Sequence, residues 1–409
     1  MRRVVVTGIG GISALGSNWA DTEAGLRAGI NTIRRMPEWD SYGDLHTKLG
    51  GPIDGFEPPA HWTRKQLRSM GRVSQLAVRA AELALEDAGL RDSPIVKSGA
   101  MGVACGSSIG STADIKDFAQ MLISGASERL NANSYVRMMP HTTTANVGIF
   151  LGLKGRLIPT SSACTSGSQG IGFAYESVRY GHQTVMLGGG ADELCPSEAM
   201  AFDMLYATSR RNAEPKSSPR PYDRDREGLV VGEGGCMLVL EELDNALARG
   251  AHIRAEIVGF ATNSDGTHVT RPEEGTMRVV MELALAAASL QPQDIGYVNG
   301  HGTATEHGDI AETRATSAVF GARMPLSSQK SYLGHTMGAC GALEAWFSIE
   351  MMNRGWFAPT LNLENVDPSC GDLDYIAGAG RALDVEHVMS NNFAFGGVNT
   401  SLVFKRWDK

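Results

Sequence analysis

The chain contains 409 residues, of which 42% are hydrophobic and 20% charged, a composition typical of globular proteins. Its length exceeds that of one ordinary hydrophobic core, so two domains or two fused halves are expected. The net charge of −8 gives no overall attraction to nucleic acid, and no apolar run reaches the ~20 residues that a membrane span needs. The six cysteines form no CxxC pair and no zinc-spaced cluster, which favours a reducing compartment. We therefore expect a cytoplasmic protein that binds neither nucleic acid nor membrane.

Strand-like and helical segments alternate along the chain. The β-branched run at 4–8 predicts a first strand, and the amphipathic pattern at 73–90 predicts a helix that ends at Gly89. The later segments are predicted as strands at 101–106, 184–190, 236–243, 255–262 and 295–302, helices at 277–290 and 340–352, and a turn-rich segment leading into a last strand at 388–404. This alternation predicts an α/β fold with buried sheets. A charged loop at 208–228 precedes the strand at 236, and we place the boundary between the halves near 250, giving units 1–250 and 251–409.

Three glycine-rich stretches are candidates for phosphate binding. The first, GIGGISALG at 8–16, follows a strand but has Ser13 where a dinucleotide fingerprint needs glycine or alanine, and no acidic residue ends a second strand about 20 residues later. The other two, at 106–111 and 188–193, lack the Lys-Ser/Thr of a phosphate loop, so we predict tight turns there. Nucleotide binding is therefore not expected.

The stretch PTSSACTSGSQG at 159–170 places Cys164 just before a helical pattern. The preceding serines and threonines suit a helix N-cap, and a thiol there would face the positive end of the helix dipole, which favours the thiolate. Glycines at 167, 170 and 172 would let another element or a ligand approach closely. The alternative is a buried structural cysteine, which fits the apolar or Gly/Ala-rich surroundings of Cys105, Cys236 and Cys340 better than the polar surroundings of Cys164. From these residues alone, both interpretations of Cys164 stay open.

A cysteine nucleophile needs partners. Two of the ten histidines lie in Gly/Thr-rich loops beside predicted buried strands, His301 in NGHGTATEHGD and His335 in KSYLGHTMGACG. Either residue could instead be a core histidine. His307 competes with His301 in the same loop, and His301, His307 and Asp309 could form a metal site, although their spacing matches no helical ligand motif. Five further histidines lie in polar segments and are predicted at the surface: His46, His61, His182, His252 and His387.

Four motifs in this order, SSACTSG, GHGTAT, KSYLGHTMGACGALE and SNNFAFGGVNTS, resemble those of the elongating β-ketoacyl-acyl-carrier-protein synthases, condensing enzymes of the thiolase superfamily. The resemblance extends along essentially the whole chain. Within that family the amino-acid sequence is most similar to that of the ketosynthases of bacterial aryl polyene pigment clusters. The resemblance implies a five-layer αβαβα thiolase fold of two pseudo-duplicated halves. It also implies decarboxylative Claisen condensation of malonyl carrier with a cysteine-bound acyl chain.

The resemblance implies roles for the site residues. Cys164 matches the nucleophile that takes an acyl group from the carrier's phosphopantetheine thioester. His301 and His335 match the two histidines that promote decarboxylation and stabilise the enolate oxygen through Nε2–H, which requires both imidazoles to be neutral. The backbone N–H groups of Cys164 and Phe395 match an oxyanion hole. Lys330 and Glu344 match a buried ion pair that orients the histidine loops.

The resemblance also implies substrate contacts and partners. Thr303 and Thr305 match positions that bind the pantetheine arm, Asp309 matches a family acid, Ile109 matches the gate of the acyl pocket, and Phe393 and Phe395 belong to the substrate loop. An acidic acyl carrier protein would dock on a basic surface, for which the matching residues are Lys65, Arg68, Arg72 and Arg211. For any single one of these a solvated helix face is the alternative. A homodimer, or a heterodimer with a chain-length-factor-like subunit, is expected, with no redox cofactor and no catalytic metal.

Two departures from the family pattern concern the substrate. Ala394 replaces the second position of the F-G-F-G-G motif, where its Cβ would restrict φ and alter gating. Glu306, followed by His307, replaces the proline after GTxT. The alternative functions are a general type II fatty-acid elongation synthase and an acyl-CoA thiolase. A non-catalytic chain-length factor would lack Cys164, and a cysteine hydrolase would need a Cys-His-Asn/Asp set open to water.

Overall fold

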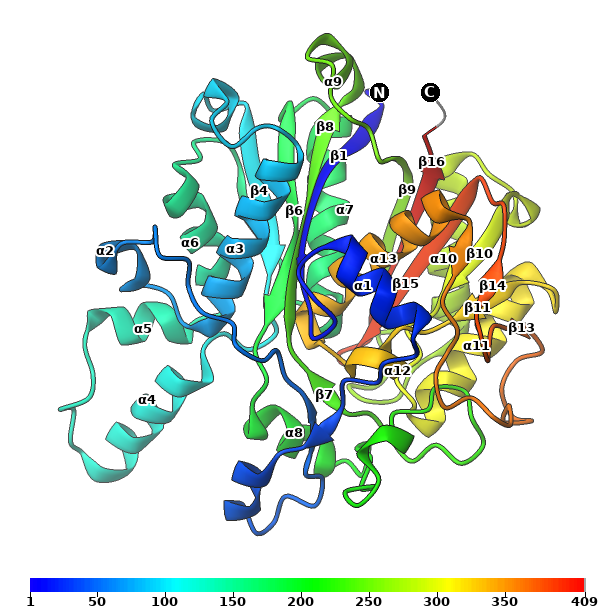
Figure 1. The fold of residues 1–409 in the computed structure, drawn as a ribbon, viewed down its shortest axis with the longest axis horizontal. Helices are drawn as coiled ribbons and strands as arrows, with labels where there is room; N and C mark the ends of the chain where they lie inside the picture. Colours follow the sequence, from blue (N-terminus) through cyan, green and yellow to red (C-terminus); the bar gives the residue numbers. More distant parts are fainter. Residues whose placement is uncertain (408–409) are drawn as a thin grey trace.

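A computed structural model describes residues 1–407, which build one large mixed sheet from two halves of identical strand order. In the first half the order is β5-β4-β6-β8-β1, and in the second it is β11-β10-β15-β16-β9 (Figure 1). The first five strands are β1 (Val4–Ile12), β4 (Met101–Gly106), β5 (Leu157–Pro159), β6 (Val185–Asp192) and β8 (Gly234–Glu242). Their counterparts are β9 (Ala255–Ser264), β10 (Ile295–Asn299), β11 (Pro325–Ser327), β15 (His387–Ala394) and β16 (Val398–Arg406), with β13 (Asp374–Tyr375) added at the outer edge.

The direction of the strands repeats as well. β4 pairs in parallel with β5 and β6, whereas β8 is antiparallel to β6 and β1. β10 likewise pairs in parallel with β11 and β15, and β16 is antiparallel to β15 and β9. The halves join where Val4–Val6 of β1 pair with Ala255–Ile257 of β9. The structure therefore contains the same five-stranded unit twice, as the resemblance implied.

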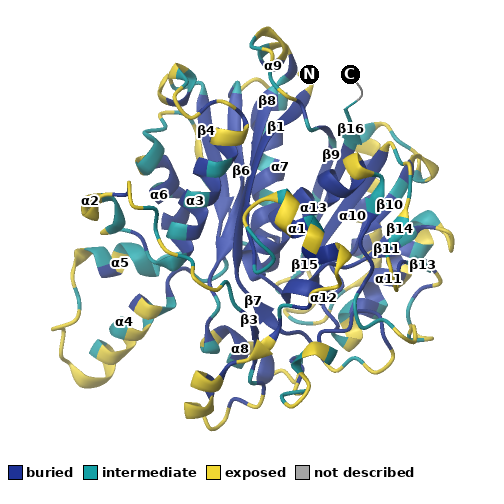
Figure 2. Ribbon diagram, viewed as in Figure 1, coloured by how far each residue is buried: buried dark blue, intermediate teal, exposed yellow. Residues whose placement is uncertain are grey.

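Helices form three layers around these strands. α3 (Arg72–Asp87) and α6 (Thr142–Leu151) cover the outer face of the first half, and α10 (Glu274–Ala288) and α11 (Glu306–Phe320) cover that of the second. α7 (Ser166–Arg179) and α13 (Cys340–Arg354) lie between the halves and share one apolar core with strands of both. Alternate residues of a strand enter different cores, so that Val103 faces α3 and Ala104 faces α7. This is the predicted αβαβα architecture, and most residues of its inner strands and central helices are buried (Figure 2).

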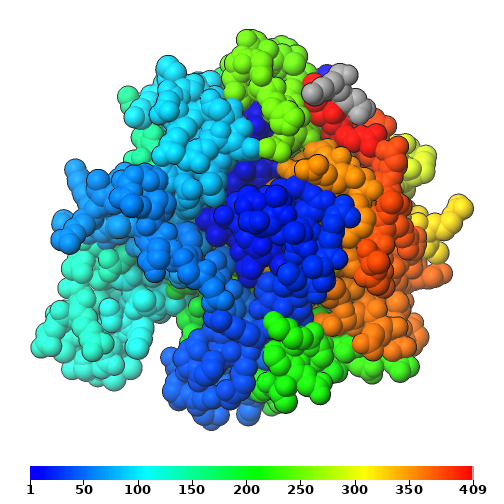
Figure 3. All heavy atoms as spheres, viewed as in Figure 1, coloured from blue at the N-terminus to red at the C-terminus, as the bar shows by residue number. Residues whose placement is uncertain are grey.

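Shorter elements decorate this framework. The remaining helices are α1 (Trp19–Arg27), α2 (Arg64–Leu67), α4 (Thr112–Ser124), α5 (Ala132–Met138), α8 (Pro196–Asp203), α9 (Leu243–Ala248) and α12 (Lys330–Leu333). Two small sheets consist of β2 (Arg34–Arg35), β3 (Leu49–Gly51) and β7 (Val231–Gly232), and of β12 (Trp356–Phe357) and β14 (Arg381–Ala382). The N-terminal segment crosses the seam between the halves on the face shown in Figure 3, where Trp19 packs edge-on against Trp346 of α13. Within residues 1–407, none of the helices combines the length and the apolar character needed to cross a membrane.

Three expectations about local structure are wrong. Gly188–Gly190 lie inside β6 instead of in a tight turn, because their missing side chains let neighbouring backbone approach: a Cβ on Gly190 would lie 2.4 Å from the carbonyl oxygen of Gly338. His387 is buried, because it begins the interior strand β15. No serine or threonine side chain caps α7, whose N-cap residue Thr165 makes no such hydrogen bond.

The glycines of β1 allow α3 to pack against the sheet. We expect Gly10→Ala to lower the free energy of unfolding by about 1–3 kcal/mol, because its Cβ would lie 2.2 Å from the carbonyl oxygen of Ala80 and 2.4 Å from the nitrogen of Ala84, so that backbone must move. Chemical denaturation measures this loss. Gly43→Ala is the matched control, since nothing lies within 4 Å of a Cβ there, and equal stability of the two variants would contradict the packing argument.

Candidate active site

The two central helices begin opposite each other, each through a short 3₁₀ turn. Ala163–Thr165 leads into α7, and Met337–Ala339 leads into α13. Both turns start with a non-glycine residue in the left-handed region, with φ of 51° at Ala163 and 50° at Met337. A Cβ on Gly167 would lie 2.8 Å from the carbonyl oxygen of Gly338, so the helices meet almost backbone to backbone, as the glycines after Cys164 predicted. This contact brings the two entry turns together.

Cys164, His335 and His301 converge at this point, and all three are buried. Cys164 is the middle residue of the first turn, His335 precedes the second turn, and His301 follows β10. The Cys164 Sγ and the His335 Nε2 are 3.0 Å apart. The ring of His301 stands nearly perpendicular to that of His335, with their centroids 5.2 Å apart. The structure therefore brings together three residues that are distant in sequence and that the motifs singled out.

Lys330 contacts His301 through the ring nitrogen that faces away from the site. Its Nζ donates to the Glu344 carboxylate and, over 3.1 Å, to Nδ1 of His301. Because a lysine ammonium can only donate, Nδ1 of His301 accepts and the ring proton resides on Nε2, which faces the site. Asn392 donates to the other Glu344 oxygen over 2.6 Å. The predicted ion pair thus exists and is fully inside the protein.

The electrostatics keep both imidazoles neutral. Burial and the Lys330 charge lower the pKa of His301 and of His335 well below the usual histidine value. Glu344 in turn raises the pKa of Lys330, which stays a cation. Neutral imidazoles are what the histidine roles implied by the resemblance require.

The Cys164 thiol is also neutral at rest. Burial raises its pKa to about 12, although Lys330 and the backbone N–H of Phe395 act in the opposite direction. The expectation that the helix terminus would favour a thiolate is therefore wrong for the resting site, because the desolvation of the sulfur outweighs these contributions. Deprotonation of Cys164 must be coupled to the reaction, with His335 Nε2 in position to take the proton.

Two backbone N–H groups point toward the sulfur. Those of Phe395 and of Cys164 itself both favour its ionised form, so they converge on the place where negative charge would develop. Phe395 lies in the turn between β15 and β16, whose left-handed residues are Gly396 (φ 86°) and Gly397 (φ 69°). Ala394 is the last residue of β15 and pairs with Val398, so it needs no conformation that a Cβ would forbid. The Cβ at this position is therefore compatible with the strand, and its effect on gating stays a prediction.

Two buried acids bind the backbone of the loop that carries His301. Glu312, on α11, accepts the backbone N–H groups of His301 and, over 2.7 Å, Gly302. Asp309, the family acid of the motif analysis, accepts those of Thr303 and Ala304, each over 3.1 Å. Burial raises the pKa of Glu312 to about 8 and that of Asp309 to about 6.

Sequence reasoning missed Glu312 and also Asp192. The latter lies at the end of β6 and accepts the backbone N–H of Gly338 over 2.7 Å, which ties the second entry turn to the first half of the fold. The only sequence signals were an acid three residues after Asp309 on the same helix and an acid closing a glycine-rich strand.

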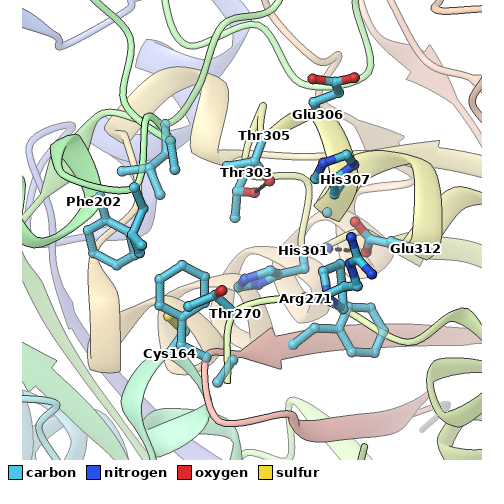
Figure 4. A pocket seen from close by; sticks show the side chains of 18 of the residues that line it. Cys164, Phe202, Thr270, Arg271, His301, Thr303, Thr305, Glu306, His307 and Glu312 are labelled. Carbon is cyan, nitrogen blue, oxygen red and sulfur yellow. Dashed lines mark hydrogen bonds between the residues drawn. The ribbon is translucent and has the colours of Figure 1, made fainter. Parts of the chain in front are cut away.

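A pocket of about 440 Å³ opens in front of these groups. Cys164 and His301 lie at its base, with Thr303 and Thr305 above them (Figure 4). The hydroxyl oxygens of the two threonines are 2.9 Å apart. The predicted loop residues Phe393 and Phe395 also line it, together with Phe202, Arg271, Glu306 and His307. Ile109 is not among the lining residues, so its gating role stays a prediction.

The predicted docking residues have different environments. Lys65 and Arg68 are exposed on and directly after α2. Arg72 is bound to Glu233, with 2.7 Å between Nε and Oε2, and Arg211 donates to the carbonyl oxygen of Asp225 over 2.9 Å. None of the four lines the pocket. Of the four predicted docking residues, Lys65 and Arg68 therefore have the side chains that are more available to bind a partner.

Within residues 1–407, two groups of side chains have the spacing of metal ligands: Cys164 with His301 and His335, and His301 with Cys340 and Glu344. Both contain His301, which already accepts a hydrogen bond from the Lys330 cation, and Glu344 is paired with that cation. A second positive charge would be repelled there. The predicted alternative of His301, His307 and Asp309 does not form such a group, since Asp309 binds backbone N–H groups.

Comparison with known proteins agrees with this geometry. The family model "Beta-ketoacyl synthase, N-terminal domain" matches residues 1–246 and "Beta-ketoacyl synthase, C-terminal domain" matches 254–364. The "3-oxoacyl-[acyl-carrier-protein] synthase 2" of Synechocystis sp. is 37% identical over 99% of this chain and 98% of its own. A β-ketoacyl synthase from Burkholderia phymatum superposes with a TM-score of 0.99 at 60% identity, with both chains fully covered. The chain belongs to the β-ketoacyl synthase family, a class of condensing acyltransferases.

Two further solved structures contain partner proteins. The ishigamide ketosynthase/chain length factor superposes with a TM-score of 0.92 at 32% identity over the whole of both chains. A type II polyketide ketosynthase in complex with its acyl-carrier protein superposes with a TM-score of 0.88 at 28% identity, again over the whole of both chains. These two neighbours therefore assemble with a chain length factor and with an acyl-carrier protein, respectively.

The Lys330–Glu344 pair generates a stability prediction. Glu344→Leu should destabilise the protein by about 3–5 kcal/mol, because it leaves the Lys330 cation buried without a counter-ion. The double variant Lys330→Met/Glu344→Leu should be more stable than Glu344→Leu, since it removes both charges. Urea denaturation of the three proteins measures this difference, and a double variant that is no more stable than Glu344→Leu would show that the stranded charge is not the cause.

Glu312 generates a pH prediction. In the folded protein its pKa is raised to about 8 from the usual 4.5, so the stability that the proton confers is present below pH 4.5 and is lost as the pH rises through 8. Glu312→Gln cannot ionise, so its stability relative to the wild type should increase between pH 5 and pH 8. Denaturation at both pH values measures the change. Glu306→Gln, at an exposed carboxyl, is the control for loss of a surface charge, and a constant difference for Glu312→Gln would rule out the mechanism.

Proposed function

We propose that this chain catalyses the decarboxylative Claisen condensation of malonyl-acyl-carrier-protein with an acyl chain bound to Cys164. The observation that carries the proposal is the contact of the Cys164 sulfur with His335 Nε2, beside a His301 whose Nε2–H faces the same pocket. This arrangement supplies a nucleophile, a proton acceptor and a hydrogen-bond donor within one buried site. Family membership supports the same reaction class.

The first half-reaction loads the enzyme. The Cys164 sulfur attacks the carbonyl carbon of the acyl-carrier thioester while its proton passes to His335 Nε2. The oxyanion that forms is stabilised by the backbone N–H groups of Cys164 and Phe395. Collapse breaks the bond to the carrier sulfur, which takes the proton from His335 and leaves as the free carrier thiol. The acyl group remains on Cys164.

The second half-reaction extends the chain. After loading, His335 Nε2 is unprotonated again, so the Nε2–H of His301 binds the thioester oxygen of malonyl carrier. The enolate formed as CO₂ leaves is stabilised by this donor without prior protonation of the ring. The enolate carbon attacks the Cys164 thioester, and the same two backbone N–H groups stabilise the second oxyanion. Cys164 is expelled as a thiolate and takes one proton from the solvent, and the β-ketoacyl carrier is released. Thr303 and Thr305 are positioned along the pocket to bind the pantetheine arm.

For the substrate we infer an aryl polyene chain. The support is the sequence resemblance to aryl polyene ketosynthases, together with Glu306 and His307, where the sequence departs from the family motif. Both residues line the mouth of the pocket. A general fatty-acid elongation synthase is the second candidate, because the curated relatives carry that activity's name.

For the partners we infer an acidic acyl carrier protein, docking near Lys65 and Arg68, and a second subunit of the same fold. The edge strand β5 ends the sheet, and the neighbouring α4 and α5 expose large apolar side chains, of which Leu122 and Ile123 are 79% and 82% accessible. A homodimer and a heterodimer would both cover this surface. Light scattering of the purified chain tests the assembly.

The nucleophile is tested directly by Cys164→Gln. This variant should lose acyl transfer and elongation, because no sulfur remains to form the thioester, and it should keep decarboxylation of malonyl carrier, because both histidines and the oxyanion donors remain. Intact-mass spectrometry and CO₂ release measure the two activities. Cys370→Ser, which removes a partly exposed thiol away from the pocket, is the control.

Two results would decide against this assignment. Elongation by Cys164→Gln would remove Cys164 from the mechanism. Mapping of acyl adducts to another cysteine would do the same. A panel of saturated and aryl-enoyl carrier thioesters separates the substrate candidates: adducts from aryl-enoyl chains alone indicate a pigment enzyme, and adducts from saturated chains indicate general elongation.

A further inference from the structure

Helix α8 carries a buried carboxyl group without a partner. Glu198 is 3% exposed, and neither of its carboxyl oxygens has a hydrogen-bond partner in the described chain. Within residues 1–407 it is the only carboxyl group with both oxygens buried and unpartnered. Burying a polar group without a hydrogen bond is unfavourable by a few kcal/mol, so such a group in a well-packed interior calls for a physical explanation.

The position of Glu198 relates it to the pocket. The buried residues of α8 are Glu198, Ala199, Phe202 and Asp203, which form one face of the helix. Glu198 and Phe202 are four residues apart and therefore neighbours on that face. Phe202 lines the pocket that contains Cys164, and its ring lies against that of Phe395, with 5.1 Å between centroids. Glu198 itself does not line the open pocket, and it lies about one helical turn from Phe202 along α8.

The side chains around these rings can change conformation. Ala199 and Phe202 belong to an apolar cluster with Met36 and Met337, and Phe395 and Met200 pack against it. Methionine side chains are unbranched and flexible, so such a cluster can rearrange to admit a chain. An acyl group on Cys164 that displaced the two phenyl rings would enter this cluster. Its distal end would approach the inner face of α8.

The charges near Glu198 determine what it can bind. Burial and the acids Asp192, Glu193 and Glu233 raise its pKa well above the usual glutamate value. A carboxylate ion buried there without a hydrogen bond would be strongly unfavourable, so the group is a neutral carboxylic acid, which both donates and accepts a hydrogen bond. A hydroxyl group has the same pair of capacities, whereas a methyl end would leave the acid unpartnered.

We propose that Glu198 is a specificity-determining residue that hydrogen-bonds a hydroxyl group at the distal end of the acyl chain. This inference rests on the proposed function, because the chain must be attached to Cys164. A site built to bind a substrate hydroxyl discriminates strongly against the analogue that lacks it, since the buried polar group then loses its only partner.

The test is single-turnover acylation of the full chain, followed by intact-mass spectrometry. The probes are pairs of carrier thioesters of equal length, several lengths in all, with ends that differ only by a hydroxyl: methyl against hydroxymethyl, and phenyl against hydroxyphenyl. For at least one length the wild type should prefer the hydroxylated member by about tenfold or more. Glu198→Leu should abolish this preference, and Glu198→Gln, which can still donate and accept, should keep most of it.

Controls separate the outcomes. Glu38→Leu changes an exposed carboxyl next to Trp39 of the same apolar cluster and should leave the preference unchanged. Glu198→Leu should also have a Tm at least as high as the wild type, because it removes an unpartnered group. Acylation without a hydroxyl preference at any length, or an unchanged preference in Glu198→Leu whatever its Tm, would overturn the inference and leave the proposed function standing. Absence of any adduct on Cys164 would overturn the proposed function and this inference with it.

Discussion

The close contact between the first turns of α7 and α13 is the constraint on which the site depends. Gly167 allows it, since a Cβ there would lie 2.8 Å from the carbonyl oxygen of Gly338. Only this separation lets Cys164 and His335, which lie 171 residues apart, share a hydrogen bond. The duplicated strand order explains why such a contact exists, because each half directs its central helix to the same seam. The chemistry therefore resides at the joint of the two halves and in neither half alone.

Burial then sets the protonation of the groups at this joint, and one buried cation modifies it. Burial and the Lys330 charge lower the pKa of His301 and of His335, whereas burial raises the pKa of the Cys164 thiol against the opposing effect of Lys330, whose own charge Glu344 balances. Burial opposes every charged form, so the histidines and the thiol are neutral at rest. A neutral donor set costs less to bury than ions do, and it exerts its full effect only when an oxyanion develops. The same neutral groups therefore allow the site to be buried and stabilise the oxyanion.

Sequence reasoning succeeded where periodicity was strong and failed where tertiary contacts decided. The pattern at 73–90 gave a helix that spans Arg72–Asp87, and the run at 101–106 matches β4. The glycines of 188–190 were misassigned because close packing and tight turns require the same residue. The expectation of a Cys164 thiolate failed because polar neighbours in the sequence do not reveal burial.

The order of the motifs identified Cys164, His301, His335, Lys330 and Glu344 as one site. Glu312 and Asp192 were missed because they bind backbone N–H groups and leave no local sequence pattern. The boundary near 250 and the docking residues stay predictions.

Residues with unfavourable backbone conformations, or with buried groups that lack a hydrogen bond, indicate which parts of the structure serve catalysis and substrate selectivity. Ala163 and Met337 adopt left-handed backbone conformations that side chains rarely take, and Glu198 buries a carboxyl group without a partner. All three lie on elements around the Cys164 site, whereas the cores on either side of the sheets follow the expected apolar pattern. Strained turns fix the reacting atoms, which any acyl chain needs. An unpartnered acid does nothing for the reacting atoms, so its unfavourable burial is offset only if a particular chain supplies the missing hydrogen bond.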